Sequence, residues 1–222
     1  MKRILFVLTS TATIGPRNRP TGYEFSEVAY PYTEFTHQSY QVDFASLVGG
    51  EPPAEGYDPD DQTSRLFFEG AGFRRLNQSQ PLASLDSQPY AAIFFPGGLG
   101  PMVDMAANVE VKKLIAQVYE RGGVVGAVCH GPVALLNVRL TTGQPLLAGK
   151  RVTSFTEAEE EGHSRADVPF LLDAALVEAG AQHSHGAPFE AYTVTDGQLV
   201  TGQNPASARA VAQAMIRLLT TQ

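Results

Sequence analysis

The chain has 222 residues, a formal net charge of −7 and a single cysteine. One cysteine excludes an internal disulfide, the scattered lysines and arginines argue against a nucleic-acid face, and no apolar run approaches the ~20 residues of a membrane span. The first residues lead into a short strand pattern and not into a signal peptide. We therefore expect a cytoplasmic protein that acts on a small neutral or anionic metabolite.

Short apolar runs alternate with amphipathic helical patterns along the chain. Strands that alternate with helices favour right-handed crossovers, a mostly parallel sheet covered on both faces, and ligands at the carboxyl ends of the strands. We expect an α/β fold in a single domain over residues 1–222. The strands are predicted at 3–8, 40–47, 90–95 and before Cys129, and the helices at 21–35, at 109–119 after the N-cap Asn108, and after Asn204, with Pro205 as its first helical residue.

The first predicted helix contains Glu27, and helical periodicity alone does not decide whether this carboxylate faces solvent or a functional site. Thr21 and Glu24 form a plausible capping box ahead of an apolar face at helical spacing. By angle, Glu27 lies on the opposite face, which is typical of a solvated carboxylate. Pro31 cannot donate to the Glu27 carbonyl, so the helix should distort there, and such distortions often occur at functional sites.

Two segments exceed a minimal α/β domain. Residues 49–85 are rich in Pro, Gly, Asp and Gln, with one short helical pattern around residues 64–73. We expect this segment to be an insertion over the mouth of the ligand pocket. After a polar turn at 141–149, residues 151–155 predict a further strand.

The strand at 90–95 ends in a glycine-rich exit, Pro-Gly-Gly-Leu-Gly-Pro. Backbone N–H groups in such a turn can meet an oxyanion or a phosphate. The spacing departs from the dinucleotide fingerprint Gly-x-Gly-x-x-Gly. Because this strand is expected beside the Cys129 strand, we interpret Gly97, Gly98 and Leu99 as an oxyanion and substrate site.

Cys129 ends an apolar strand of small residues and is followed at once by His130-Gly131-Pro132. A thiol at a sharp strand-to-helix turn would lie above the carboxyl edge of the sheet, near a positive helix end that favours the thiolate. Free cysteines are more often buried as small hydrophobes. The adjacent histidine and the open glycine turn favour a nucleophile here, one suited to attack on a carbonyl.

The acidic run at residues 157–161 and the remaining histidines allow further interpretations. By default the run is a solvated helix start, although one of its carboxylates could orient His130. His183 and His185 have a spacing that could chelate a metal, but no acidic or cysteine partner completes a set. We expect no metal and no other cofactor.

Taken together, these motifs resemble the ThiJ/PfpI superfamily, in its heat-shock-chaperone-like branch that includes glyoxalase III and the protein deglycases. The resemblance covers nearly the whole chain. It rests on Thr21-Gly22 with Glu27 and Pro31, residues 43–46 with 49–50, 58–59, 96–98, 128–132, 149–150, 153–156 with 159–160, and 196–207.

The resemblance implies a flavodoxin-like three-layer sandwich and a catalytic role for four residues. Cys129 would be the nucleophile, with Glu27 beside the thiol and His130 oriented by Glu160 or, failing that, by Glu159. The N–H groups of Gly98 and His130 would form the oxyanion hole. Members of this branch often carry a histidine where this chain has Leu99, so the pocket is more apolar than the family pattern.

The chemistry implied is a glyoxalase reaction without metal or glutathione, or a related deglycase reaction. The Cys129 thiolate would add to a 2-oxoaldehyde such as methylglyoxal, Glu27 or His130 would move a proton through an enediol, and hydrolysis of a thioester would release a 2-hydroxy acid. A protonated Glu27 would favour a thiolate at neutral pH. The family implies a homodimer, which is also the commonest soluble assembly.

Two other classes of function remain open at this point. A cysteine amidase or peptidase would use the same nucleophile but would need a groove for an extended chain, whereas the 49–85 segment is expected to close the pocket. A stress-response holdase or thiol redox sensor would oxidise Cys129 without turnover, and a holdase should show a large exposed apolar patch.

Overall fold

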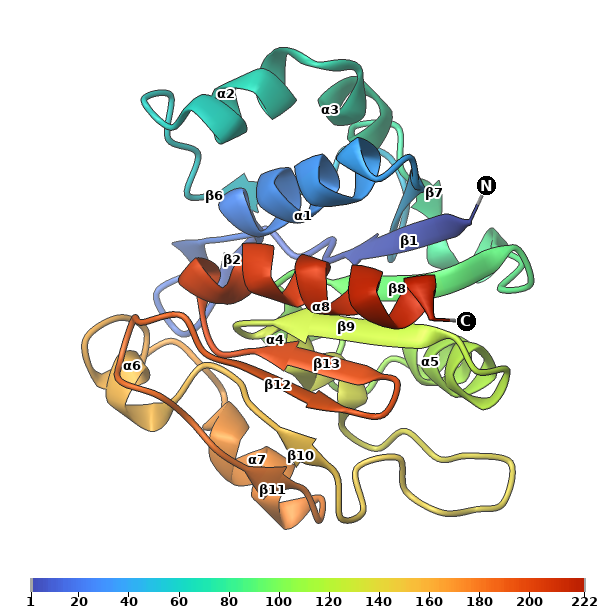
Figure 1. Cartoon of the computed structure of the whole chain (residues 1–222). Coiled ribbons are helices and arrows are strands. Elements are labelled where there is room, and N and C mark those ends of the chain that lie inside the picture. The colour runs from blue at the N-terminus through green and yellow to red at the C-terminus, as the bar shows by residue number, and fades with distance from the viewer. Residues whose placement is uncertain (1, 222) are drawn as a thin grey trace.

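A seven-stranded sheet forms the centre of the computed structural model, which describes residues 2–221 (Figure 1). All of its neighbouring strands pair in parallel except β12 with β13. The α/β prediction with a mostly parallel sheet is thus confirmed. The strand order is β12 (Thr193–Asp196), β13 (Leu199–Gly202), β9 (Val124–Val128), β8 (Tyr90–Phe95), β1 (Arg3–Leu8), β5 (Gln41–Ser46) and β7 (Gln80–Pro81).

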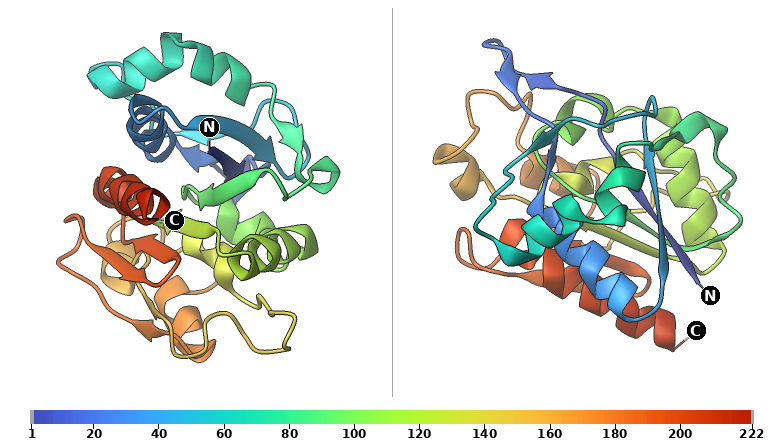
Figure 2. Two further views of the ribbon diagram at one scale, coloured as in Figure 1. Left: turned by 45° about the vertical axis from the view of Figure 1, so that its right-hand side comes forward. Right: turned by 90° about the horizontal axis from the view of Figure 1, so that it is seen from above.

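Helices cover both faces of this sheet and enclose two separate apolar cores (Figure 2). One face is covered by α1 (Ser26–His37) and α8 (Ala208–Thr220), with α2 (Gln62–Glu69) and α3 (Ala71–Leu76) outside α1. The other face is covered by α4 (Pro101–Asp104), α5 (Val109–Glu120) and α7 (Leu172–Glu178). β8, β9 and β1 after Arg3 are built from apolar residues and glycine because both of their faces are buried.

Several short elements surround the carboxyl edge of the sheet, where the loops after β1, β8 and β9 meet. Three pairs of two-residue strands form there and nearby, together with a short helix and three 3-10 helices. They are β2 (Thr13–Ile14) with β3 (Arg19–Pro20), β4 (Tyr23–Glu24) with β6 (Ala54–Glu55), β10 (Arg151–Val152) with β11 (Gln182–His183), α6 (Glu157–Glu161), η1 (Leu82–Ser84), η2 (Gly131–Leu135) and η3 (Pro205–Ser207).

The start of the first helix differs from the prediction. α1 begins at Ser26, and the proposed capping box of Thr21 and Glu24 does not form. Instead Glu24 lies in β4, and the Thr21 hydroxyl donates to Glu55 Oε1 at 3.0 Å. The capping-box prediction was wrong because a strand partner 31 residues downstream competes for the same local sequence.

Three further boundaries also differ. The strand predicted at 151–155 is only Arg151–Val152, and it pairs with β11 outside the main sheet. At the C-terminus, α8 begins at Ala208 after the 3-10 turn Pro205–Ser207, and Asn204 makes no side-chain cap. The helix expected directly after Cys129 is a 3-10 helix of five residues, which weakens the argument from a helix dipole.

The segment 49–85 is placed mainly away from the pocket. Its helices α2 and α3 pack on α1, and β7 extends the edge of the sheet. Only Glu55 and Gly56 of this segment reach the pocket described below. Most of the segment therefore does not cover the pocket mouth, in contrast to the expectation. In the described part of the chain, no helix has the length and apolarity needed to cross a membrane.

Candidate active site

Cys129 occupies a strained turn at the carboxyl end of β9. Its φ is +60°, a left-handed conformation that non-glycine residues seldom adopt and that costs of the order of 1–3 kcal/mol. Hydrogen bonds on both sides hold the turn: Cys129 N donates to Gly202 O at 2.9 Å, and Phe155 N donates to Cys129 O at 3.0 Å. The thiol is thereby fixed at the edge of the sheet, with the residue only 4% exposed.

Two glycines at the end of β8 allow the backbone to pass directly beside this turn. A Cβ on Gly97 would lie 2.7 Å from His130 N and 2.8 Å from Cys129 Cβ. Gly98 has a φ of +82°, and its Cβ would lie 2.4 Å from Gly22 O. No other residue type fits at either position without displacing backbone.

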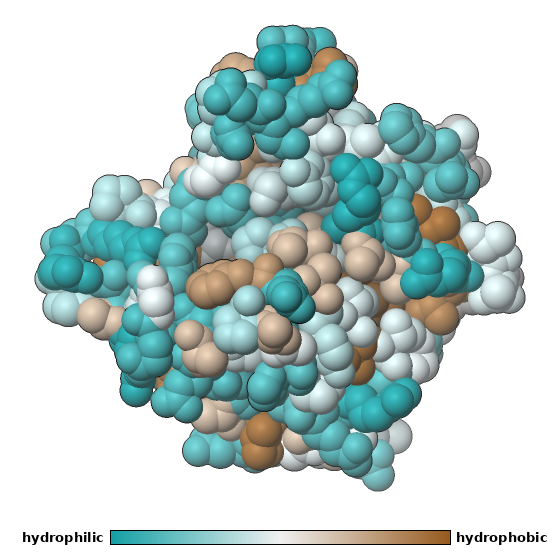
Figure 3. Space-filling model, turned by 60° about the vertical axis from the view of Figure 1, so that its left-hand side comes forward, coloured by the Kyte–Doolittle hydropathy of each residue, from teal (hydrophilic) through white to brown (hydrophobic). Residues whose placement is uncertain are grey.

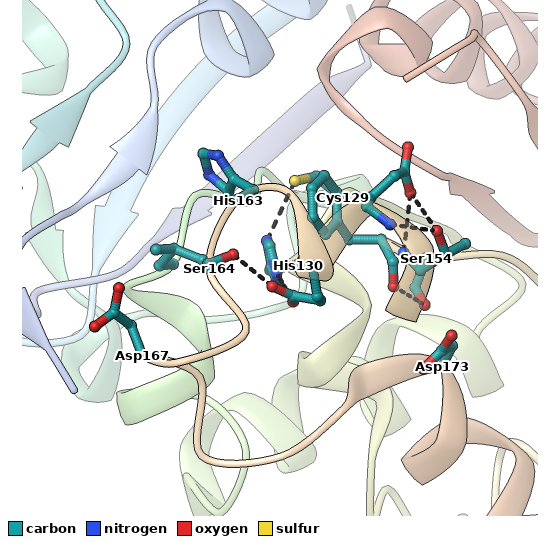
Figure 4. A network of polar contacts seen from close by, with 12 residues as sticks. Cys129, His130, Ser154, His163, Ser164, Asp167 and Asp173 are labelled. Atoms are coloured by element: carbon teal, nitrogen blue, oxygen red, sulfur yellow. Dashed lines mark hydrogen bonds and ion pairs between the residues drawn. The ribbon is translucent and has the colours of Figure 1, made fainter. Parts of the chain in front are cut away.

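His130 links the thiol to a buried carboxylate (Figure 4). Its Nδ1 lies 3.3 Å from Cys129 Sγ, and its Nε2 lies 2.6 Å from Glu160 Oε1. The Ser164 hydroxyl donates to the other oxygen of Glu160. Burial alone would raise the pKa of Glu160, but the hydrogen bonds from His130 and Ser164 lower it overall, so this carboxyl is ionised. Nε2 therefore carries the proton, and Nδ1 is free to accept one from the thiol.

The acidic run that contains Glu160 is half buried, and its two buried carboxylates have different partners. Glu160 contacts His130, as the resemblance implied, whereas Glu159 closes a capping box with Thr156. Glu159 Oε1 also accepts from Phe189 N at 2.7 Å and from Asn204 Nδ2 at 2.8 Å. The default interpretation of the whole run as a solvated helix start was wrong for these two residues, which are at most 1% exposed.

Glu27 is fully buried beside the thiol, so its assignment to the solvated face of α1 was wrong. Near the first turn of α1, the face that carries Glu27 is covered by the chain that follows β8, where Gly97 lies. Glu27 Oε2 accepts from Gly97 N at 2.5 Å, while its Oε1 has no hydrogen-bond partner among the described residues. A buried oxygen without a partner is costly unless the carboxyl is neutral or a ligand completes it.

The thiol and the Glu27 carboxyl influence each other's ionisation. Burial, and next the charge of Glu24, raise the pKa of Glu27 well above its ordinary value, so we take this carboxyl to be neutral at pH 7. Burial also raises the pKa of the Cys129 thiol, and an ionised Glu27 would raise it further. This direction opposes the expected thiolate at neutral pH, although a neutral Glu27 removes the repulsion.

The backbone donors near the thiol are not all available for an oxyanion. The N–H of Gly97 is used by Glu27, and the N–H of Leu99 donates to Glu55 Oε1 at 2.9 Å. The N–H of Gly98 points to the thiol and lowers its pKa. The N–H groups of Gly97 and Leu99 are therefore not available to an oxyanion, which leaves those of Gly98 and His130 beside the thiol. Gly98 and Leu99 both line the pocket.

A pocket of about 370 Å³ opens above the thiol at this end of the molecule. Figure 3 looks onto this end and shows hydrophobic residues near its centre with hydrophilic residues around them. Burial, and next the charge of Arg19, lower the pKa of His163 at its rim. The lining residues are Arg19, Glu24, Glu55, Gly56, Gly98, Leu99, Cys129, His130, Phe155, His163, Phe189 and Pro205.

Sequence patterns missed several of these lining residues. Glu24 was assigned to a helix cap, and Glu55 belongs to a segment whose composition indicates only a loop. Phe189 follows a polar stretch with no periodic signal, although it reaches the pocket and packs on Phe155 with ring centroids 6.1 Å apart. No local signal in the sequence could have placed these three side chains around one cavity.

His183 and His185 do not lie at this pocket. Ser154 Oγ and His183 Nε2 are 3.1 Å apart, and His185 Nδ1 is 2.9 Å from Gly186 O. Across residues 2–221, no group of three or more His, Cys, Asp or Glu side chains is arranged to hold a metal ion.

Comparisons with known proteins find relatives that cover nearly the whole chain. Residues 20–218 match the model of the DJ-1/PfpI family. The chain is 30% identical to glyoxalase 3 of Candida albicans over 97% of its length and 98% of that protein. It is also 30% identical to the glutathione-independent glyoxalase HSP31 of Saccharomyces cerevisiae, with 95% of each chain covered.

Solved structures of two similar proteins have the same fold over nearly the whole chain. Glyoxalase III from Candida albicans superposes with a TM-score of 0.89 at 28% identity and covers 98% of this chain and 97% of that one. The rapid encystment protein of 24 kDa from Francisella tularensis superposes with a TM-score of 0.94 at 34% identity, with 99% of both chains covered.

Proposed function

The chain belongs to the DJ-1/PfpI family, and we propose that it is a glutathione-independent glyoxalase that converts a 2-oxoaldehyde such as methylglyoxal to a 2-hydroxy acid. The family resemblance carried by the sequence motifs is confirmed. The observation that supports the activity best is the buried chain Cys129–His130–Glu160, with the Glu27 carboxyl beside the same thiol.

In the first step, Cys129 Sγ adds to the aldehyde carbon and its proton passes to His130 Nδ1. The ionised Glu160 stabilises the imidazolium that forms, as an orienting carboxylate does in other nucleophile–histidine pairs. The new alkoxide of the hemithioacetal lies near the N–H groups of Gly98 and His130. Both donors belong to turns fixed by tight backbone packing, so little reorganisation accompanies the reaction.

In the second step, the neutral Glu27 gives its proton to the ketone oxygen and the resulting carboxylate moves the C1 hydrogen to C2. An enediol is the intermediate, and the product is a thioester of a 2-hydroxy acid. Water then hydrolyses the thioester, which releases the acid and regenerates the thiol. The proton held by the His130 imidazolium returns through water to the Glu27 carboxylate, so both groups end in their starting states. Every proton moves between groups of this chain, the substrate and water, so the sequence of steps uses no cofactor.

The test is to incubate the purified protein with methylglyoxal in the absence of glutathione and to measure lactate. We expect wild type to form one lactate for each methylglyoxal consumed, and Cys129→Ser to form none. Consumption of methylglyoxal without lactate would contradict the proposal, because it would indicate stoichiometric trapping by nucleophilic side chains.

We also propose that the protein is a cytoplasmic homodimer. The single cysteine of the chain is free, and free thiols persist in a reducing compartment such as the cytoplasm. Closed two-fold dimers are the commonest assembly of soluble proteins. Light scattering at micromolar concentration is expected to give twice the chain mass, and a monomeric mass would rule out the dimer.

A further inference from the structure

The pocket extends well beyond the groups that react. Its volume of about 370 Å³ falls in the range of pockets that hold ligands much larger than methylglyoxal. We call Glu24, Glu55 and Phe189 the outer wall. These three side chains line the pocket but take no part in the steps above. The outer wall therefore offers contacts that a three-carbon aldehyde would leave unused.

Two carboxyl groups form the acidic part of the outer wall. Glu24 and Glu55 are register partners on β4 and β6, so their side chains lie on the same side of the strand pair. Glu24 Oε1 accepts from the Ser26 hydroxyl at 3.1 Å, and Glu55 Oε1 accepts from Thr21 and Leu99. Neither Oε2 accepts a hydrogen bond in the described part of the chain.

No cation neutralises these carboxyls. Neither Glu24 nor Glu55 forms an ion pair within residues 2–221, and the nearby Arg19 is bound to Asp167 and to the backbone oxygen of His163. Carboxylate oxygens accept hydrogen bonds from hydroxyl groups and repel anions. This side of the pocket thus suits a substrate rich in hydroxyl groups and without negative charge.

Phe189 gives the outer wall a flat apolar face. Its backbone is left-handed, with a φ of +62°, which a bulky residue rarely adopts, and its side chain is 55% exposed. The conformation is held by the buried Glu159, which accepts from Phe189 N at 2.7 Å, and by Asn204, which donates to Glu190 O at 2.7 Å. Backbone strain of this kind clusters at functional sites, and here it presents an aromatic ring to the pocket.

From these observations we infer that the preferred substrate is a 2-oxoaldehyde with a hydroxylated carbon chain, as those formed from sugars have. Glu24 and Glu55 accept its hydroxyl groups, and Phe189 packs against its C–H face. The inference rests on the proposed glyoxalase reaction and assigns its substrate class. Glu24 and Phe189 are then specificity-determining residues, and Glu159 positions Phe189.

The test compares kcat/KM for 3-deoxyglucosone, a sugar-derived 2-oxoaldehyde, with kcat/KM for methylglyoxal. We expect wild type to prefer 3-deoxyglucosone. At pH 8, above the Glu24 pKa of about 7, Glu24→Leu should lower the ratio of the two values about tenfold or more, the usual effect of removing a hydrogen bond to a charged group. Phe189→Ala should lower the ratio through KM. The ratio cancels any effect of Glu24 on the ionisation of Cys129, which both substrates share.

Glu69→Leu is the matched control, because Glu69 is exposed on α2 away from the pocket. It should leave both values unchanged. Should Glu24→Leu not fold, Glu24→Gln replaces it, with a smaller expected change in the ratio because one acceptor oxygen is kept. A ratio that favours methylglyoxal in wild type and is the same in the pocket variants would overturn the inference.

Binding to the inactive Cys129→Ser protein separates this inference from the proposed function. Calorimetry with 3-deoxyglucosone should show binding that Glu24→Leu weakens about tenfold or more in the same background. Absence of turnover with both aldehydes in wild type would reject the glyoxalase activity. In that case weakened binding in Glu24→Leu would still support the recognition of hydroxyl groups, and no binding would reject it.

Discussion

The inner site and the outer wall of the pocket are built in different ways. Cys129, His130, Glu160 and Glu27 are at most 4% exposed, and each is held by tight backbone packing or by a buried hydrogen bond. The outer wall comes from two-residue strands and a loop, and its side chains keep free polar atoms or exposed apolar surface. Rigid surroundings fix the reacting groups, while the elements that contact the rest of a substrate can change without disturbing the core.

The largest effect expected within the inner site is that of Cys129→Ser. A serine hydroxyl ionises far less readily than a thiol, so nucleophilic attack should almost cease, with turnover of methylglyoxal lowered at least ~10³-fold. The measurement is lactate formation under saturating substrate. Because the turn is fixed by backbone hydrogen bonds, the melting temperature should change little, which separates lost chemistry from lost folding. Full activity would remove Cys129 from the mechanism.

Glu27 comes next. Glu27→Gln and Glu27→Leu should each lower turnover ~10²–10⁴-fold, because neither side chain can carry a proton. The pH dependence of Cys129 alkylation reports which charge Glu27 has in wild type. If Glu27 is neutral and donates to the thiolate, the leucine variant should shift the midpoint of alkylation to higher pH.

The opposite shift would contradict a neutral Glu27. A lower midpoint in Glu27→Leu would mean that wild type carries a charged carboxylate that repels the thiolate. Identical alkylation curves for wild type and both variants, or full activity in either variant, would reject the contact between Glu27 and the thiol altogether.

A smaller effect is expected from the carboxylate behind the histidine. Glu160→Gln keeps the shape but not the charge that orients His130, and should lower turnover about 10²-fold, near the lower end for a positioned proton-transfer group. Glu161→Gln is the matched control, since Glu161 is exposed and, within residues 2–221, forms an ion pair with Arg165 alone. Equal turnover of wild type and both variants would leave the acidic run with a structural role.

In the outer wall, the effect expected from Glu24 is on the stability of the fold. Burial, and then the neighbouring Glu55, raise the pKa of Glu24 from 4.5 to about 7. A carboxyl whose folded pKa lies above its unfolded pKa stabilises the fold least when it is ionised. Wild type should therefore lose stability as pH rises from 4.5 to 7.

Glu24→Gln removes this dependence. The variant should be more stable than wild type at pH 8, by up to ~3 kcal/mol, and the difference should disappear near pH 4.5. Urea unfolding at the two pH values measures it, with Glu69→Gln as the control. A difference that is independent of pH would mean that Glu24 does not titrate between the two values.

The sequence alone determined the central strands of the sheet and the position of the candidate nucleophile. Apolar runs predict β1 and β8 with their observed bounds, since strands buried on both faces consist mainly of apolar residues, with Arg3 at the start of β1 as the exception. The glycines after β8 indicate a place where the backbone passes close to another segment, and the cysteine after β9 marks the end of a buried strand. In the structure, Gly97 passes directly beside the Cys129 turn. These features are local, and they are therefore visible in a short window of sequence.

Only the tertiary structure decided which carboxylates enter the site. Helical periodicity assigned Glu27 to solvent, but its partner Gly97 lies 70 residues away on another strand. Helical periodicity indicates the most apolar face of a helix. It carries no information about a distant segment of the chain that covers the opposite face. The same reason explains why Glu160 and not Glu159 meets His130, and why Glu24, Glu55 and Phe189 surround one pocket: each contact joins segments whose approach is set by the whole fold.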